Sequence, residues 1–444
     1  MNEISNIPLW CSVPFVVMLL AIATGPLIAE KWWGQNKNKL LISLLLGIPV
    51  TIYMLVNGFS GDLANTIIYD YVPFMILLGS LFVITGGIHL SGDIKATPGN
   101  NTIFLGIGFL LASIMGTTGA AMLLIRPVIT TNQQRKFTTH TILFFIAVVA
   151  NCGGLLTPLG DPPLFILYLR GAEFSWFLNL FPEWIFTGTL LLMIYYFVDR
   201  YFYKKEEWVD IAEDYIRIKP IRVTGNINFL FLIGVVIAVA FINKGNIPQM
   251  GEENASIWLK YLREIVLVIL ASMSLYYTKR EVRSNNRFSW DPIIEVAYLF
   301  LGIFVTMAPT LIWLAKNAAS FGVTEPWQFL YSSGMLSSFL DNTPTAVAFY
   351  DLARGLVVAG LPASLSSGSM MAGIPEILLK AICVGSVFFG SMTYIGNGPN
   401  FMVKSIAEDS GIKMPGFFGY MWKFSLIVLL PIYILVQLIF LGNQ

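Results

Sequence analysis

Long runs of apolar residues, each about the length of a membrane-spanning helix, alternate with short polar loops along this chain. A helix that crosses the hydrocarbon core of a bilayer needs about 20 predominantly apolar residues. Windows of that length predict eight continuous spans, near residues 10–29, 40–57, 71–90, 181–200, 226–243, 257–277, 292–312 and 417–441. The pattern therefore predicts an all-α membrane protein that crosses the bilayer many times.

Two further apolar stretches, 140–169 and 376–408, are too long for one straight span. About 30 helical residues would reach about 45 Å, whereas the hydrocarbon core is about 30 Å thick. Their centres read LTPLGDPPLFI (156–166) and MTYIGNGPNFM (392–402), and proline and glycine at such positions interrupt helices. We therefore predict that both of these spans are broken at mid-membrane.

Polar tips interrupt two other apolar stretches, 102–134 and 327–358, at MGTTGAA (115–121) and LDNTPTA (340–346). Each is predicted to be a re-entrant hairpin. With hairpins at these places, one set of loops holds sixteen lysine and arginine residues and the opposite set holds six. Basic loops stay in the cytoplasm. The layout is therefore about ten transmembrane helices plus two hairpins, with both termini outside.

The two halves of the chain resemble each other. Three blocks recur in the same order: LLGSLFVITGG (77–87) as FLGIFVTMAPT (300–310), SIMGTTGAAM (113–122) as SSFLDNTPTAV (337–347), and LTPLGDPPLFI as MTYIGNGPNFM. Each half has five spans, so the second must be inverted relative to the first. We predict a first repeat at 1–201, a cytoplasmic linker at 202–225 and a second repeat at 226–444.

Composition excludes several classes of protein. Of the residues, 56% are hydrophobic and 12% are charged, whereas soluble domains carry about 25% charged residues. The net charge of +1 and the scattered basic residues give no nucleic-acid site, and three distant cysteines suggest neither a disulfide nor zinc. No nucleophile with a base is visible. We expect no enzyme activity and no cofactor; the expected partners are the lipid bilayer and a small ion or small-molecule substrate.

Inverted repeats with broken helices are typical of secondary transporters, whose sites lie near the bilayer midplane. Irregular backbone at that depth lines a cavity, and its carbonyls and half-helix ends become ligands. The two tips and two breaks should therefore converge. The candidate binding residues are Gly116, Thr117, Thr118, Asn151, Thr157, Pro158, Gly160, Asp161, Asp341, Asn342, Thr343, Thr345, Thr393, Gly396, Asn397 and Asn400.

Asp161 and Asp341 carry the most weight among these candidates. An ionisable residue inside a membrane is costly and marks a functional site by default. The simpler alternative is that each acid only caps the helix that follows it. Asp351 and Arg354, three residues apart, are expected to pair with each other.

The motif NCGGLLTPLGDPP (151–163) resembles the Gly-Gly…Thr-Pro-Ile-Gly-Asp-Pro-Pro-Asn signature of the ion transporter superfamily. That group includes divalent anion/sodium symporters, arsenite permeases, NhaD-type sodium/proton antiporters and relatives assigned to citrate transport. GSMTYIGNGPN (390–400) resembles the matching motif of the second repeat, and DNTPTA resembles a Ser-Asn-Thr hairpin tip. The resemblance implies a homodimer in the bacterial inner membrane, with a fixed scaffold domain and a transport domain that moves like an elevator.

This sequence departs from that pattern at three places. The first tip is Gly-Thr-Thr, Asp161 stands where dicarboxylate carriers commonly have threonine, and Leu164 replaces asparagine. Two carboxylates would repel a dianion and favour a cation. The leading expectation is therefore a sodium/proton antiporter in which both ions compete for Asp161 and Asp341. The alternative is a sodium-coupled citrate or dicarboxylate symporter, and a channel is a third reading.

Overall fold

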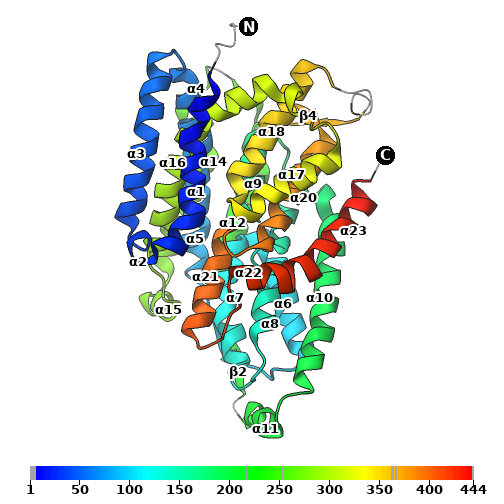
Figure 1. The fold of residues 1–444 in the computed structure, drawn as a ribbon. Coiled ribbons are helices and arrows are strands. Elements are labelled where there is room, and N and C mark those ends of the chain that lie inside the picture. The colour runs from blue at the N-terminus through cyan, green and yellow to red at the C-terminus, as the bar shows by residue number, and fades with distance from the viewer. Residues whose placement is uncertain (1–6, 217, 253, 362–364, 366–367, 443–444) are drawn as a thin grey trace.

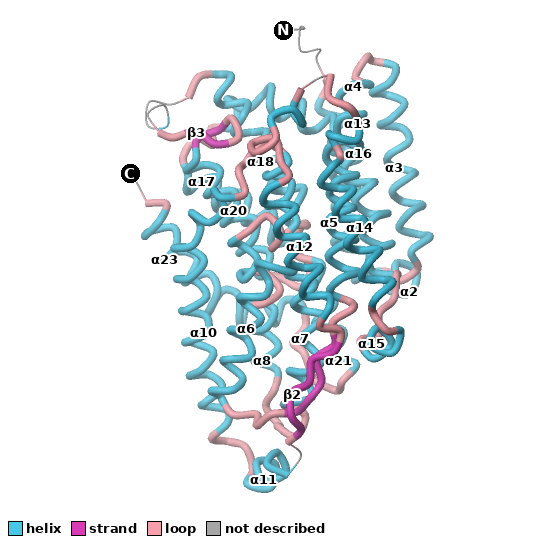
Figure 2. The backbone as a smooth tube through the Cα atoms, turned by 180° about the vertical axis from the view of Figure 1, so that it is seen from behind, coloured by secondary structure: helices cyan, strands magenta, loops and turns pink. Residues whose placement is uncertain are grey.

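The computed structural model describes residues 7–216, 218–252, 254–361, 365 and 368–442. They form an upright bundle of helices, and two very short pairs of strands lie at its two ends (Figures 1 and 2). Within the described residues, eight helical stretches are long and apolar enough to cross a membrane. The chain is therefore an all-α, multi-pass integral membrane protein.

One group of helices is formed by the early part of each half of the chain. In the first half these are η1 (Leu9–Ser12), α1 (Val13–Ile28), α2 (Glu30–Trp33), α3 (Asn36–Val56), α4 (Ser60–Asn65), the π-helix η2 (Thr66–Tyr71) and α5 (Val72–Thr85). In the second half they are α12 (Ile227–Phe241), η5 (Pro248–Gly251), α13 (Ile257–Lys260), α14 (Leu262–Tyr277), α15 (Arg280–Asn285), α16 (Asp291–Asn317) and η6 (Ala318–Phe321). α16 packs on α1 and α3, and α14 packs on α5 and α12.

The two predicted hairpins are present as pairs of helices with sharp turns. They are α6 (Pro98–Met115) with α7 (Thr117–Thr131), and α17 (Pro326–Phe339) with α18 (Asn342–Ala359). The first turn is a single residue, Gly116, with φ of +82°. Only glycine adopts that conformation without strain, so Gly116 lets α7 begin directly after α6 ends.

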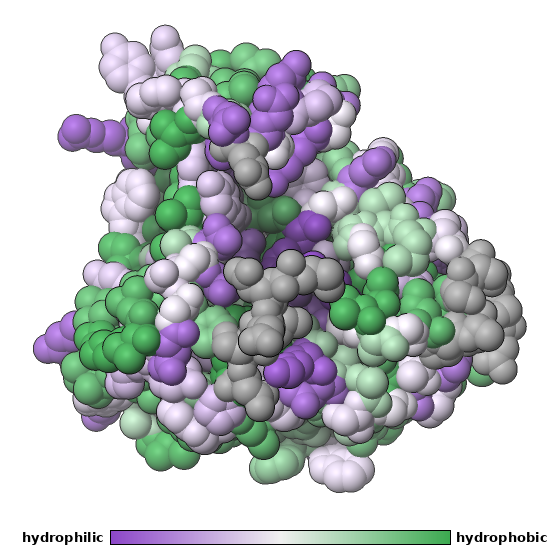
Figure 3. All heavy atoms as spheres, turned by 90° about the horizontal axis from the view of Figure 1, so that it is seen from above, coloured by the Kyte–Doolittle hydropathy of each residue, from purple (hydrophilic) through white to green (hydrophobic). Residues whose placement is uncertain are grey.

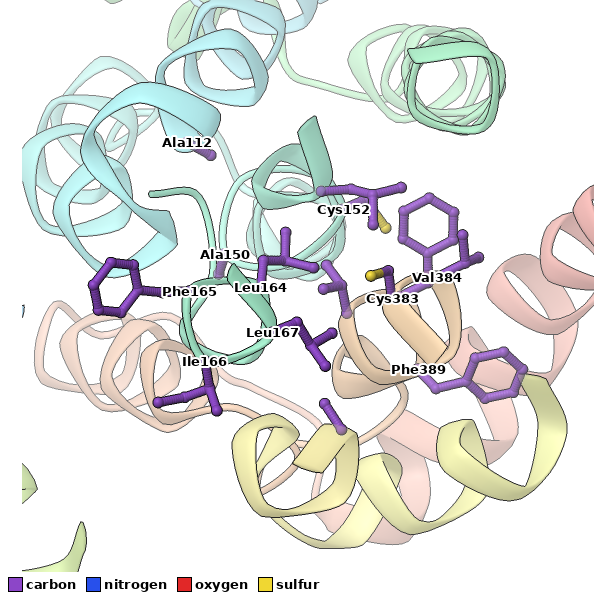
Figure 4. Close-up of a cluster of buried hydrophobic side chains, with 14 of the residues drawn as sticks. Ala112, Ala150, Cys152, Leu164, Phe165, Ile166, Leu167, Cys383, Val384 and Phe389 are labelled. Atoms are coloured by element: carbon purple, nitrogen blue, oxygen red, sulfur yellow. The ribbon is translucent and has the colours of Figure 1, made fainter. Parts of the chain in front are cut away.

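Both predicted breaks are also present. The first separates α8 (Thr139–Val148) from α9 (Pro162–Leu169) through a short 3₁₀ turn, η3 (Cys152–Leu156). The second separates α20 (Glu376–Phe389) from α21 (Gly398–Asp409) through η7 (Gly390–Met392). Figure 4 shows Leu164 and Leu167 of α9 directed toward α20, where Cys383 and Val384 lie near Cys152. This apolar contact holds the two interrupted helices together.

Two long helices and the linker complete the bundle. α10 (Phe181–Tyr203) follows η4 (Ser175–Leu180), and the last helix runs through α22 (Phe417–Tyr420), the π-helix η8 (Met421–Leu429) and α23 (Leu430–Phe440). The linker contains α11 (Trp208–Ile216) and β2 (Lys219–Thr224), which pairs antiparallel with β1 (His89–Asp93). A second pair joins β3 (Met370–Met371) to β4 (Ile374–Pro375). Neither strand pair was predicted.

Some span boundaries differ from the prediction. The span expected at 71–90 begins at Ser60 and ends at Thr85. α12 has 15 residues and α14 has 16, so neither is among the eight long apolar stretches, whereas the hairpin arm Pro98–Met115 is. The count of ten transmembrane helices stays a prediction.

The two ends of the bundle differ in what they carry. The N- and C-terminal ends lie in the upper half of Figure 1, whereas α2 lies near mid-height, α15 lies below it and α11 lies at the lower end. The side of the membrane on which the termini lie stays a prediction. Figure 3 looks down on the upper face, where hydrophilic side chains surround a recess near the centre.

Candidate functional site

Asp161 lies at the junction of the hairpin tips and the breaks. It precedes α9 in extended backbone (φ −142°, ψ 142°), and its side chain does not cap that helix. Its Oδ1 accepts hydrogen bonds from Thr117 Oγ1 at 2.8 Å and Asn397 Nδ2 at 3.3 Å. Its Oδ2 accepts one from Asn342 Nδ2 at 2.8 Å. The side chain is 1% exposed, so one buried carboxylate connects both tips and the second break.

The first hairpin tip is bound to the first break through backbone as well as side chain. Thr117 N donates to Gly160 O at 2.8 Å. A Cβ on Gly160 would overlap Gly154 O, so the chain can fold back on itself here only with glycine. The close approach places the beginning of α7 directly against Asp161.

The second hairpin tip reaches Asp161 through Asn342. Ser337 Oγ donates to Asn342 Oδ1 at 2.6 Å and also lies 2.6 Å from Ser386 O. That contact fixes the amide so that its Nδ2 faces the carboxylate. The sequence analysis did not select Ser337. Its position in the repeated block, five residues before Asn342, is the signal that could have found it.

Three asparagines extend the polar network from Asp161 to the second break. Asn397 Nδ2 donates to Asn151 Oδ1 at 3.2 Å and Ala150 O at 3.1 Å. Asn151 Nδ2 donates to Asn400 Oδ1 at 2.7 Å. Asn400 Nδ2 in turn donates to Gly390 O at 2.8 Å and Thr393 O at 2.9 Å. The network satisfies buried carbonyls that the interrupted helix leaves free.

The two breaks have the same local geometry. Asp161 and Asn397 have φ, ψ values of −142°, 142° and −145°, 141°. Thr157 Oγ1 donates to Ser113 O in the first break, and Thr393 Oγ1 donates to Ser338 O in the second. Each threonine hydroxyl also accepts from the backbone N two residues later, at 3.2 Å.

The serines that receive these bonds match in the same way. Ser113 Oγ donates to Gly153 O, and Ser338 Oγ donates to Phe389 O. A Cβ on Gly396 would crowd Gly390 O, just as one on Gly160 would overlap Gly154 O. Each hairpin is therefore tied to its own break by the same pair of hydroxyl contacts.

Asp341 does not join this network. Its side chain accepts from Thr343 N at 3.0 Å and caps α18, so the simpler of the two readings describes its contacts. Thr345 Oγ1 donates back to Asp341 O at 3.1 Å and belongs to the same helix turn. Thr343 Oγ1 is buried and has no hydrogen-bond partner among the described residues. Pro158 lies buried in the first break.

A cavity of about 80 Å³ opens beside the first tip. Gly116, Thr117 and Thr118 form one wall together with the first break. The facing wall is apolar except for Thr85 and comes from α5 and the beginning of α16. The space is large enough for a few water molecules or a small ion, and it lies next to the donors that hold Asp161.

The oxygen atoms at this junction suit a proton or a hard cation. They are a carboxylate, hydroxyls, amide oxygens and backbone carbonyls, which are the ligands that hard cations take. In the described part of the chain, no three His, Cys, Asp or Glu side chains are grouped so as to hold a metal ion.

The pairing expected within α18 is not the one observed. Asp351 forms its ion pair with Arg170, the residue directly after α9, at 3.2 Å, instead of with Arg354. Arg170 also pairs with Asp70 at 3.0 Å. The Arg170 guanidinium donates to both carboxylates at once, each from a different nitrogen. Arg354, three residues after Asp351 on the same helix, forms no such pair of contacts among the ion pairs of the described residues.

Comparison with known proteins agrees with a transporter. Two relatives, each named an uncharacterized transporter, come from Mycobacterium bovis and Mycobacterium tuberculosis; each is 22% identical over 432 residues, which cover 92% of this chain and 93% of the relative. Residues 4–441 match the family described as "Putative citrate transport". Because that match covers nearly the whole chain, the protein belongs to this family.

Proposed function

We propose that the protein is a secondary active transporter that carries a citrate-type carboxylate together with sodium or protons. The family description supports the solute. The observation that carries the coupling is the buried Asp161 carboxylate, which accepts donors from both hairpin tips. Of the two expectations raised by the sequence, the symporter is therefore the better supported.

The hydrogen bonds of Asp161 suggest how a cation and an anion are coupled. While Asp161 is ionised and bare, it engages Thr117 Oγ1 and Asn342 Nδ2. A proton or sodium ion on the carboxylate lowers its demand for donors, because the negative charge is then compensated. The hydroxyl and the amide become available to a carboxylate of the solute. In this mechanism the cation must bind before the anion can.

The arrangement of the whole chain completes the proposal. The matching hydroxyl contacts and backbone angles of the two breaks support two inverted repeats, at 1–201 and 226–444, joined by the linker 202–225. We assign the early helices of each half to a scaffold, and the hairpins and broken helices to a domain that moves. Alternating access by that motion, and assembly as a homodimer in the bacterial inner membrane with both termini outside, are parts of the same proposal.

Sodium/proton antiport is the second candidate, and one observation favours it. The residues that line the cavity beside the first tip include neither lysine nor arginine. A multiply charged anion would meet no cationic side chain there, whereas a cation would meet Thr117 and Thr118 on its way to Asp161. In this case sodium and protons compete for the carboxylate without any organic solute.

Transport by the purified protein in liposomes separates the two candidates. The vesicles are given an inward sodium gradient, an inward proton gradient or neither, and radiolabelled citrate uptake and internal pH are recorded. Symport predicts citrate accumulation that follows one of the gradients. Sodium-driven proton movement in the absence of citrate, with no citrate uptake under any gradient, contradicts symport and supports antiport. Protein-free vesicles measure the leak.

A further inference from the structure

Arg170 joins three helices in a largely buried ion cluster. Its Nη2 lies 3.0 Å from Asp70 Oδ2, and its Nη1 lies 3.2 Å from Asp351 Oδ2. The side chains of Arg170, Asp70 and Asp351 are 18%, 13% and 9% exposed. Tyr350 packs against the cluster, with its ring 5.8 Å from the guanidinium carbon; its hydroxyl donates to Ala372 O at 2.6 Å and lies 3.3 Å from Arg170 O. Two carboxylates thus share one cation.

The three charged residues differ in how they are connected to the transport site. Arg170 directly follows α9, the helix that begins after Asp161, and Asp351 lies in α18, which begins at Asn342. Asp70 lies in the π-helix η2, which leads into α5. The Arg170–Asp351 pair therefore connects two helices that start at the site, whereas the Arg170–Asp70 pair connects the site helices to a helix of the proposed scaffold.

Other contacts close the same end of α9 against the scaffold. The Arg263 guanidinium lies over the rings of Phe165 and Tyr168, at 5.5 and 5.3 Å from their centroids. Tyr168 Oη donates to Val239 O at 2.8 Å. Because Arg263 belongs to α14 and Val239 to α12, Phe165 and Tyr168 connect α9 to two more helices of the proposed scaffold.

The opposite end of the same boundary holds a cavity, and we call it the open end. The cavity beside the first tip runs between α5 and the first break, and Thr85, at the end of α5, and Pro292 and Ile293, at the beginning of α16, line it. α5 thus meets the site elements at both of its ends, with an ion pair near Asp70 and a cavity near Thr85. The closed end faces the half of Figure 1 in which α4 and α18 lie, and the open end faces α15.

We infer that Arg170 is a gate residue, whose ion pair with Asp70 closes one access path to the site and breaks when that path opens. The inference rests on the proposed alternating access, which requires the open and closed ends to exchange. Asp351 moves with Arg170 in this scheme and compensates its charge in both states. The Asp70–Arg170 pair is then made and broken in every cycle, whereas the Arg170–Asp351 pair persists.

Thiol labelling tests the gate without any transported solute. Ile293→Cys places a reporter in the cavity, and the native Cys11, Cys152 and Cys383 are buried. The experiment uses membrane vesicles of known orientation. Asp70→Asn should weaken the closed end and shift molecules to the state in which that end is open and the cavity end is closed. A membrane-impermeant maleimide added on the cavity side should then label Ile293→Cys several-fold more slowly. Asp70→Glu should restore the rate, and Asp62→Asn, an exposed acid on α4, should leave it unchanged. Unchanged labelling in a folded Asp70→Asn protein overturns the inference.

A covalent version does not depend on how well Asp70→Asn folds. In an Asp70→Cys/Arg170→Cys protein, a reducible bifunctional thiol reagent should fix the closed end. The Ile293→Cys reporter should then stop exchanging between its accessible and inaccessible states, as maleimide labelling measures. Reduction of the cross-link should restore the exchange. A cross-linked protein that still exchanges at the original rate overturns the inference. Because neither readout uses citrate or sodium flux, an error in the proposed solute would not affect either result.

Discussion

At the break before α9 the residue in extended backbone is Asp161, and at the matching break before α21 it is Asn397. The backbone angles at the two positions agree within a few degrees. Both breaks use a threonine hydroxyl and a hairpin serine in the same way. The charge is therefore not needed to interrupt a helix inside this bundle. The two breaks are backbone frames with the same geometry, and only the first carries a charge. That charge lies where both hairpin tips donate hydrogen bonds to it.

The side chains around Asp161 and Asn397 also differ between the two breaks. Asn397 and Asn400 donate to carbonyls and to Asn151, so the second break is largely satisfied by amides of the protein. Leu164 takes the place of Asn400 in the first break and brings an apolar side chain to α20 instead (Figure 4). The first break thus keeps a carboxylate beside a cavity, and the second break is filled by side-chain amides.

Replacement of Asp161 with asparagine should have the largest effect, because it makes the first break chemically like the second. Contacts to a charged group contribute about 1.5–3 kcal/mol, so the affinity for the coupling cation should fall by about tenfold to a hundredfold. The fold should persist, since Asn397 adopts the same geometry with an amide. Isothermal titration with sodium and proton-coupled flux measure the loss. Asp409→Asn, an exposed acid on α21, is the control.

Alanine at the glycine of each break tests whether the two frames are equally tight. Gly160→Ala would overlap Gly154 O, and Gly396→Ala would crowd Gly390 O and Ser337 O. Each should lower the free energy of unfolding by about 1–3 kcal/mol through forced displacement of backbone, seen as a lower melting temperature in detergent. Gly398→Ala meets nothing within 4 Å and should be neutral. A large loss at only one of the two glycines would show that the frames are not equivalent.

Ser337→Ala removes the group that orients Asn342. The amide would lose the hydrogen bond at 2.6 Å, which contributes about 0.5–1.5 kcal/mol. We expect cation affinity to fall by about two- to tenfold with little change in melting temperature. Ser405→Ala, an exposed serine on α21, is the matched change elsewhere. An unaltered affinity would mean that Asn342 keeps its orientation without Ser337.

Asp341→Asn should have the smallest effect. Asparagine and aspartate are nearly equal as N-caps, and the contact of Asp341 is to Thr343 N of its own helix. We expect a change in unfolding free energy below about 0.5 kcal/mol and cation affinity close to that of the unmodified protein. A loss as large as that of Asp161→Asn would show that both acids hold the coupling ion.

The hydrophobic pattern was sufficient to predict that the spans, breaks and hairpins exist, but it predicted their first and last residues less well. Both breaks and both hairpin tips lie where glycine, proline and polar residues interrupt apolar runs, because those residues act on the local backbone. The span expected from residue 71 begins at Ser60 instead, since Asp62 and Asp70 lower the local hydropathy while the helix continues through them. β1 and β2 pair across more than a hundred residues, and no local pattern reports such a contact.

In the candidate site, too, some residues were predicted from the sequence and others were not. Asp161, Asn151, Asn397 and Thr117 were selected by residue type and position, and the structure brings them together. Ser337 was missed because its residue type alone gives no sign of function, and only its place in the repeated block sets it apart. Asp351 was expected to pair with Arg354 because only sequence neighbours are visible in a sequence; its partner Arg170 lies 181 positions away.

The sequence by itself determined that this chain is an all-α membrane protein with two interrupted helices, two polar tips and an acid in one interruption. These follow from apolar length, helix-breaking residues and charge, which act within a few positions along the chain. The tertiary structure alone decided that Asp161 binds both tips whereas Asp341 caps its own helix, and that Arg170 joins α9 to η2 and α18. Such choices depend on which helices pack together, because hydrogen bonds and ion pairs form only between groups that packing brings within about 3 Å of each other.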